Sequence, residues 1–254
     1  MSIPSSFSLG PVDIHLYGLT LFIALVVFIF VARRKAVFYG EKSESVWELL
    51  PWVFIHGLIG ARLYHVISFW EFYFENPKQI YAIWEGGLAI FGAIFGGVIG
   101  LSFATKKLKL NFKRWLDICA PALSFGQAIG RWGNFFNREI YGPPTNLPWG
   151  IFIEGRRFHP LFLYESLLNF FNFLALIFIS RRFKDKLKPG DIFFIYLLNY
   201  GVIRLFLEGL RFDNWKISGV PTAQIISAFL ILFSLSVIRH LPQHFIWRPG
   251  DKDS

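Results

Sequence analysis

The sequence contains little charge and a single cysteine. Only 17% of its 254 residues are charged, whereas about 25% is usual for a soluble domain. Cys119 is the lone cysteine, so no internal disulfide and no cysteine-based metal site can form. Neither a His-Glu-x-x-His zinc motif nor a Gly-x-Ser-x-Gly nucleophile motif occurs. We therefore expect no metal site and no cofactor.

Lysine and arginine are also absent from residues 1–32. The start of the chain thus lacks the basic region that opens a cleaved signal peptide. The first basic cluster, at 33–35, comes only after the first apolar run. We expect that run to remain in place as a helix.

Hydrophobic residues make up 54% of the chain, and the mean hydropathy is +0.45. Long apolar runs alternate with short basic clusters, which is typical of a multi-pass, all-α membrane protein. The net charge of +9 could suggest nucleic acid, but no globular segment presents the basic clusters, so we exclude that partner. The sequence predicts one integral-membrane domain over 1–254 with about seven spans, near 15–32, 48–70, 86–104, 115–136, 161–180, 190–210 and 221–238.

Loop charges predict the orientation of these spans. The loops after the first, third, fifth and seventh spans carry 17 Lys and Arg residues, whereas the opposite loops carry six. Because positive loops stay in the cytoplasm, the N-terminus is predicted outside and the C-terminus inside. Residues 137–160, rich in proline and glycine, are predicted to form an external loop. Gly92, Gly96 and Gly100, at spacing four, are predicted to let helices pack closely.

Polar residues interrupt the apolar spans at a few positions. A charge near the centre of a bilayer costs about 2.5–3.5 kcal/mol on insertion scales, yet Arg62, Arg131 and Arg204 lie within predicted spans. Arg131 and Asn134 share a helical face, and a guanidinium suits bidentate binding of phosphate oxygens. The arginines could therefore converge on the phosphate of a lipid. The alternative for Arg131 is a structural ion pair with Glu139 or Glu165.

The sixth predicted span carries a second charged face. Arg204, Glu208 and Arg211 are spaced at i, i+4 and i+7, so they lie on one side of a helix. The excess positive charge favours an anionic partner. The alternative is an internal salt bridge that allows the helix to insert.

Residues 130–142, GRWGNFFNREIYG, resemble the signature of the bacterial prolipoprotein diacylglyceryl transferases. Further motifs agree in order along nearly the whole chain: HLYG at 15–18, GAR at 60–62, WEGGL at 84–88, PTNLPWG at 144–150, HPxxLYE at 159–165 and YGxxRxxxExxR at 200–211. The resemblance implies an enzyme of the bacterial inner membrane whose active site faces the outer leaflet. It would transfer the diacylglyceryl group of phosphatidylglycerol to the lipobox cysteine thiol of preprolipoproteins, the first step of lipoprotein modification.

The resemblance also implies roles for individual residues. Arg131 would bind the phosphate of phosphatidylglycerol, and Arg204 would join it at the headgroup. Other positions that the family treats as important are Tyr17, Asn134, Glu139, Gly142 and Glu208, and Arg62 is a further candidate for substrate binding.

Two departures from the family pattern affect these expectations. Phe91 stands where the family has a histidine that is often proposed as catalytic, and Leu161 and Phe162 replace two polar residues. The first leaves open a catalytically altered or inactive homologue, or one that transfers a different lipid group. It also leads us to consider His65 as a base, the alternative being that no imidazole is needed. A seven-helix receptor or pump is a further class, but the last predicted span has no lysine to hold retinal.

Overall fold

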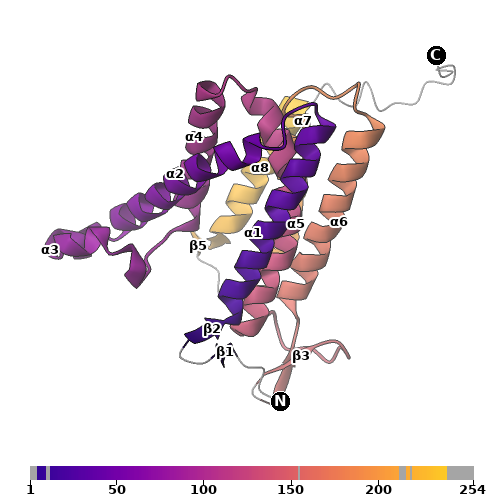
Figure 1. The fold of residues 1–254 in the computed structure, drawn as a ribbon. Coiled ribbons are helices and arrows are strands. Elements are labelled where there is room, and N and C mark those ends of the chain that lie inside the picture. Colours follow the sequence, from indigo (N-terminus) through magenta and orange to yellow (C-terminus); the bar gives the residue numbers. More distant parts are fainter. Residues whose placement is uncertain (1–4, 10–11, 154, 212–215, 218, 239–254) are drawn as a thin grey trace. The chain divides into compact units, whose positions relative to one another are not determined.

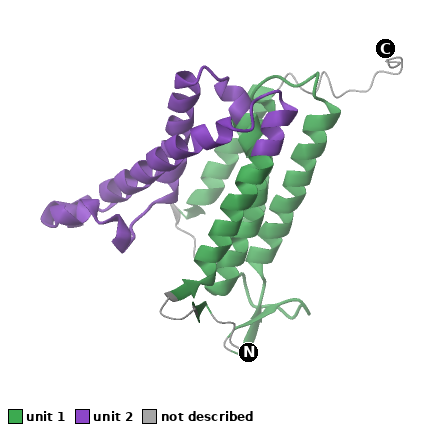
Figure 2. Ribbon diagram, viewed as in Figure 1, with its two compact units in different colours: residues 1–32, 116–254 green, residues 33–115 purple. Residues whose placement is uncertain are grey.

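The computed structural model describes residues 5–9, 12–153, 155–211, 216–217 and 219–238 (Figure 1). The predicted cytoplasmic end of the chain, residues 239–254, lies outside the described residues. The chain divides into two compact units, unit 1 with residues 1–32 and 116–254 and unit 2 with residues 33–115 (Figure 2). The prediction of a single domain stays a prediction.

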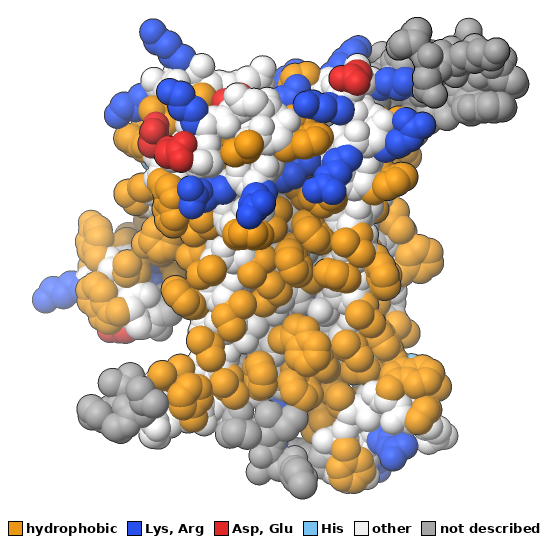
Figure 3. Space-filling view, turned by 45° about the vertical axis from the view of Figure 1, so that its right-hand side comes forward, with side chains coloured by type: hydrophobic (Ala, Val, Ile, Leu, Met, Phe, Trp, Pro, Cys, Tyr) orange, Lys and Arg blue, Asp and Glu red, His pale blue; other side chains and the backbone are white. Residues whose placement is uncertain are grey.

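A helix coincides with each of the seven predicted segments. Four of these helices, α1, α2, α4 and α6, are long and apolar enough to cross a membrane, and α8 is a shorter apolar helix. Hydrophobic side chains cover the middle of the face drawn in Figure 3, as expected for helices surrounded by lipid. The seven helices are α1 (Leu16–Phe38), α2 (Ser45–Ser68), α4 (Ile90–Lys107), α5 (Phe112–Phe136), α6 (Leu161–Arg182), α7 (Asp191–Glu208) and α8 (Thr222–Ile238).

Short elements that the sequence did not predict precede or connect these helices. Within the described residues there are three antiparallel hairpins: β1 (Ser6–Leu9) with β2 (Val12–His15), β3 (Ile151–Ile153) with β4 (Arg156–Phe158), and β5 (Lys216–Ile217) with β6 (Val220–Pro221). Between α2 and α4 lie α3 (Trp70–Glu75) and the 3-10 turns η1 (Pro77–Tyr81) and η2 (Ile83–Glu85). The helical fold class is confirmed, with these small strands added.

Buried polar side chains join the helices of unit 1. Ser124 on α5 donates to the carbonyl of Asn169 on α6 (2.8 Å), and Ser166 on α6 donates to that of Ala128 on α5 (2.7 Å). Asp117 on α5 accepts hydrogen bonds from the backbone N–H groups of Gly190 and Phe193 at the start of α7. Since these N–H groups have no partner within their own helix, Asp117 caps α7 from a neighbouring helix. These bonds fix α5, α6 and α7 against one another, and Arg131 lies on α5 and Arg204 on α7.

Glycines determine the packing of unit 2, as predicted. A Cβ atom at Gly92 would lie 2.2 Å from the carbonyl oxygen of Gly60, and one at Gly96 would lie 2.1 Å from that of His56. At Gly100 the nearest atom, the carbonyl oxygen of Trp52, would be 2.5 Å away. No side chain fits at such distances, so α2 and α4 approach to backbone contact along this stripe.

Candidate functional site

Glu165 lies between two of the predicted arginines in unit 1. Its Oε1 atom is 2.5 Å from Nη2 of Arg131 on α5, and its Oε2 atom is 3.7 Å from Nη1 of Arg204 on α7. Of the two carboxylates considered as partners of Arg131, Glu165 is therefore the one in contact. One buried carboxylate thus brings together the two arginines that the sequence analysis placed at a lipid phosphate.

The charged face predicted on α7 extends this group. Arg204 Nη2 donates to Glu208 Oε2 (2.7 Å), and Arg211 Nη1 lies 3.9 Å from the same oxygen. Arg211 follows the end of α7, where burial, and next the positive charge of Arg204, lower the pKa of its guanidinium. Arg131, Glu165, Arg204, Glu208 and Arg211 form what we call the arginine cluster.

The carboxylates of the arginine cluster are buried more deeply than its guanidinium groups. The exposed fractions of the side chains are 2% for Glu165 and 5% for Glu208, against 22% for Arg131, 13% for Arg204 and 22% for Arg211. Three cations and two anions leave a net charge of +1. The cluster therefore presents partly open guanidinium groups over a buried acidic layer, an arrangement suited to one monoanionic phosphodiester.

Asn134 and Glu139 meet where α5 ends. Asn134 Nδ2 donates to Glu139 Oε2 (3.3 Å), Asn137 Nδ2 donates to Oε1 (3.0 Å), and the Glu139 N–H donates to the Asn134 carbonyl (2.8 Å). The flanking residues Arg138 and Ile140 have positive φ angles of 54° and 57°. Such backbone is unfavourable for residues with a side chain and is found preferentially at functional sites. The predicted pair is thus held in a tight, strained turn.

Glycines make room for two other predicted positions. A Cβ atom at Gly133 would lie 2.7 Å from the ring of Tyr17, so its absence lets this α1 tyrosine pack on α5 beside Asn134. A Cβ atom at Gly142 would lie 2.9 Å from the Cβ of His159 and 3.2 Å from the carbonyl oxygen of Leu210. Gly142 therefore allows the loop after α5 to pass close to the chain before α6 and after α7.

The remaining predicted residues, Arg62 and His65, belong to unit 2. The Arg62 guanidinium is buried and bonded to backbone carbonyl groups. The His65 ring packs on Phe69 at 4.7 Å between centroids and edge-on against Tyr73 at 5.9 Å. Phe91 lies at the start of α4 and faces the ring of Tyr64 at 6.3 Å. A phosphate-binding role for Arg62 and a role as base for His65 stay predictions.

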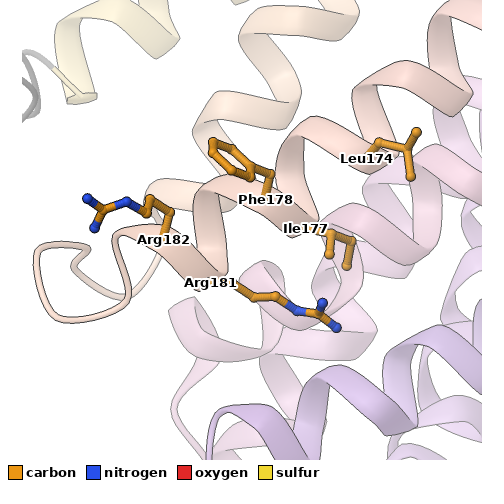
Figure 4. A pocket seen from close by; sticks show the side chains of 5 residues that line it. All are labelled: Leu174, Ile177, Phe178, Arg181 and Arg182. Carbon is orange, nitrogen blue, oxygen red and sulfur yellow. The ribbon is translucent and has the colours of Figure 1, made fainter.

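No group of three or more His, Cys, Asp and Glu residues that could hold a metal ion occurs within the part of the chain that the structure describes. A surface hollow runs along α6, lined by Leu174, Ile177, Phe178, Arg181 and Arg182 (Figure 4). None of the predicted site residues lines it. The hollow lies at the basic end of α6. Arginines in such a position typically pack their apolar stems on the helix and extend the guanidinium group towards the membrane–water interface.

Glu165 and Arg211 are the residues that the predicted site omitted. Both were visible in motifs, Glu165 at the end of HPLFLYE and Arg211 at the end of the charged face of α7. For Glu165 the available signal was an acidic side chain within a predicted span, since such a residue is energetically unfavourable there without a buried partner.

The fold defines a helical protein with four helices long and apolar enough to cross a membrane, and a group of partly buried charged side chains joins α5, α6 and α7. The chain belongs to the prolipoprotein diacylglyceryl transferase family, whose family model matches residues 4–239. It is therefore a transferase.

Curated relatives support this assignment along most of the chain. The phosphatidylglycerol–prolipoprotein diacylglyceryl transferase of Finegoldia magna is 41% identical over 228 residues, covering 89% of this chain and 91% of the relative. The enzyme of the same name from Halalkalibacterium halodurans is 40% identical, with 89% and 82% covered. That of Staphylococcus aureus is 37% identical, with 92% and 88% covered.

Proposed function

We propose that this protein transfers the diacylglyceryl group of phosphatidylglycerol to the lipobox cysteine thiol of preprolipoproteins. A carbon–sulfur bond forms, the carbon–oxygen bond to the phosphate breaks, and glycerol phosphate leaves. The observation that supports this function best is the arginine cluster, because its net charge of +1 and its partly open guanidinium groups suit one phosphodiester. The names of the relatives support the same substrates.

Arg131 and Arg204 are proposed to carry most of the catalysis. As glycerol phosphate departs, the phosphate gains negative charge, and preorganised cations in a region of low dielectric constant stabilise that charge. Glu165 contacts both arginines, so it sets their spacing before the lipid binds. Tyr17, Asn134, Glu139, Gly142 and Glu208 are proposed to shape the remainder of the site.

The attacking thiol comes from the substrate, so the enzyme needs no nucleophile of its own. A free thiol has a pKa of about 8.5 and is only a few per cent ionised at pH 7. A base would add about 10²–10⁴ in rate. The thiol proton is transferred to that base or to water. In either case the arginines stabilise the departing glycerol phosphate.

The enzyme is proposed to lie in the bacterial inner membrane with seven spans and its active site at the outer leaflet. The basic loops support a cytoplasmic location for the turns after α1, α4 and α6. Within unit 1 the arginine cluster lies at the start of α6 and at the ends of α5 and α7, opposite the turn after α6, and Tyr17 lies at the start of α1. The lipobox thiol of a preprolipoprotein would therefore bind at the outer-leaflet side of the membrane.

Complementation tests the proposed function. A strain depleted of its own transferase would be supplied with this chain, and the mass of a model lipoprotein would be measured. We expect growth and a mass gain equal to one diacylglyceryl group. A gain of another mass would indicate a different lipid group, and no gain would indicate the inactive homologue that Phe91 raises as the alternative. The relatives' names favour transfer over both.

Reporter fusions test the orientation. Fusions after residues 40, 110, 185 and 245 are expected to be cytoplasmic, and fusions near residues 78, 150 and 215 external, because 17 of the loop Lys and Arg residues lie on the first side. Alkaline phosphatase and fluorescent-protein activity measure this. An inactive phosphatase at 150 would place the predicted external loop on the wrong side.

Exchange of two residues tests the proposed base. If His65 replaces the imidazole that Phe91 lacks, His65→Phe should lower transfer by about 10²-fold, and adding Phe91→His should restore it. Transfer rates are measured for the wild type, for each single variant and for the double variant. Unchanged transfer in His65→Phe would favour the alternative that no imidazole is needed.

A further inference from the structure

Backbone carbonyl groups of one short segment surround the Arg62 guanidinium. Its Nε atom donates to the oxygen of Ile80 (2.9 Å), and Nη1 donates to those of Gly86 (2.6 Å) and Gly87 (3.1 Å). Its Nη2 atom donates to the oxygen of Gln79. A single side chain of α2 thus stabilises two separate stretches of the connection between α2 and α4.

Aromatic rings complete the surroundings of Arg62. Its guanidinium carbon lies 5.2 Å from the centre of the buried Tyr73 ring, and the His65 ring packs edge-on against the same tyrosine. Together with the carbonyl contacts, these rings give residues Phe69–Leu88 a fixed interior. We call this segment the 69–88 lobe.

The backbone of the 69–88 lobe is adapted to these contacts. Gly86 and Gly87 have φ angles of +92° and +71°, in the region that favours glycine. A Cβ atom at Gly87 would lie 2.6 Å from Arg62 Nη1 and 2.8 Å from the His65 ring. Arg62 therefore needs a glycine at position 87 if both carbonyl groups are to reach it.

The flanking helices locate the 69–88 lobe relative to a membrane. Both α2 and α4 are long and apolar enough to span one. Beside the lobe, Ala89, the residue before α4, donates its N–H to the carbonyl of Ala61 (3.1 Å), seven residues before α2 ends at Ser68. The lobe must therefore lie where this helix pair leaves the hydrocarbon, whichever side of the membrane that is.

The outer surface of the 69–88 lobe is aromatic. The exposed fractions are 74% for Phe74, 77% for Tyr81 and 80% for Trp84, and Trp70 is also more than half exposed. Large apolar side chains at such exposure are unfavourable in water, whereas Trp and Tyr are enriched at membrane interfaces. These four residues are called the aromatic surface.

The charges on the lobe indicate which part of a lipid bilayer it can bind. Glu71, Glu75 and Glu85 outnumber Lys78, so the lobe carries a net negative charge. Attraction to anionic headgroups therefore cannot hold it at the membrane. Burial of the aromatic surface at the boundary between headgroups and acyl chains can, because that contact is apolar and independent of lipid charge.

We propose that the 69–88 lobe inserts its aromatic surface into the headgroup–acyl boundary of the lipid bilayer, and that Arg62 is the positioning residue that stabilises the lobe in this shape. Arg62 does so by donating to four carbonyl groups at once, which the three-donor ammonium of lysine cannot reproduce in the same planar geometry. This inference does not depend on the proposed transferase activity, and its tests need no substrate.

Spin labels test the placement of the lobe. Cysteines would be introduced as Trp70→Cys, Trp84→Cys or Lys78→Cys in a Cys119→Ala background of the full chain, in nanodiscs of phosphatidylcholine and phosphatidylglycerol. We expect labels at 70 and 84 to collide more with oxygen than with a water-soluble nickel chelate, and the label at 78 to show the reverse. The difference should persist in nanodiscs of phosphatidylcholine alone. Equal nickel access at all three positions would overturn the placement.

Two substitutions test the role of Arg62. Arg62→Gln and Arg62→Lys should make the label at 84 more mobile and more accessible to nickel, whereas the same change at an exposed arginine of unit 2, Arg33→Lys, should not. Gly87→Ala disturbs the contacts between Arg62 and the lobe without changing Arg62 itself, and it should likewise make the label at 84 more mobile. It replaces Arg62→Gln as the test if that variant does not fold. Its control is Gly40→Ala, which has a similar φ of +79° but no neighbour within 4 Å.

Other partners give different results. If nickel is excluded from position 84 only after an apolar signal peptide is added, the lobe binds that peptide and the bilayer assignment is wrong. If Arg62→Gln abolishes transfer yet leaves label mobility and nickel access unchanged, Arg62 acts on the substrate and the positioning role is wrong. Labels at 84 that report a second copy through dipolar coupling would assign the surface to a dimer instead.

Discussion

Lysine in place of Arg131 is expected to lower diacylglyceryl transfer by about 10²–10³-fold, the range for loss of one preorganised donor. The charge is retained, so helix insertion should be normal. What is lost is the planar fork that can bind two phosphate oxygens while Glu165 holds the side chain at 2.5 Å. The effect should fall mainly on kcat, because the charge on the leaving phosphate develops in the transition state.

Transfer would be measured with purified protein, phosphatidylglycerol and a lipobox peptide. The matched control is Arg156→Lys, since Arg156 is an exposed arginine of the same unit. Arg204→Ala should give a loss at least as large as Arg131→Lys. Near wild-type transfer by Arg131→Lys would mean that this residue provides charge alone, without bidentate binding of phosphate.

Helices were the part of the fold that the sequence predicted well. Apolar runs of about 20 residues locate the hydrocarbon, but they do not mark helix ends. The first predicted segment ends at residue 32, whereas α1 continues through its basic cluster to Phe38, because charged residues end a hydropathy window without ending a helix. The third segment was predicted from residue 86, whereas α4 begins at Ile90, since Gly86 and Gly87 adopt positive φ angles.

The 69–88 lobe was not predicted. The sequence analysis assigned Trp70 to the end of one predicted span and left residues 71–85 between two spans. The lobe depends on hydrogen bonds from Arg62 to backbone carbonyl groups. Because every residue has such a group, the sequence does not show which of them accept these bonds. For the same reason, the sequence could suggest an anionic partner for Arg62 but could not reveal carbonyl partners.

The candidate site was predicted in part. Helical spacing placed Arg204, Glu208 and Arg211 on one face, and the structure pairs the two arginines with Glu208. Contacts between helices are different, because they depend on how α5, α6 and α7 pack. The contacts of Glu165 with Arg131 and Arg204 are of this kind. The sequence alone therefore left both Glu139 and Glu165 as possible partners of Arg131.

Glutamine in place of Glu165 is expected to destabilise the protein by about 3–5 kcal/mol, the cost of removing one partner from a buried ion pair. Glu165 is 2% exposed and contacts both Arg131 and Arg204. Without its charge, Arg131 and Arg204 lose the carboxylate that contacts both of them, and the summed charge of the five residues of the arginine cluster rises from +1 to +2. Glu165→Asp keeps the charge on a shorter stem, so it should lose less stability and retain part of the transfer activity.

Lipid dependence distinguishes a role at the phosphate site from simple structural damage. A bound phosphatidylglycerol would supply the missing negative charge, and a ligand that binds only the folded state raises stability by mass action. Adding phosphatidylglycerol should therefore raise the Tm of Glu165→Gln more than that of the wild type, whereas phosphatidylcholine should raise the two equally. The control is Glu44→Gln, a surface carboxylate 4.0 Å from Arg33, which should change neither stability nor lipid response. The Tm of the wild type, of Glu165→Gln and of Glu44→Gln is measured by thermal unfolding in detergent, with each of the two lipids. If Glu165→Gln were as stable as the wild type, or gained no more from phosphatidylglycerol than from phosphatidylcholine, Glu165 would not be the anion that balances the two arginines before the lipid binds.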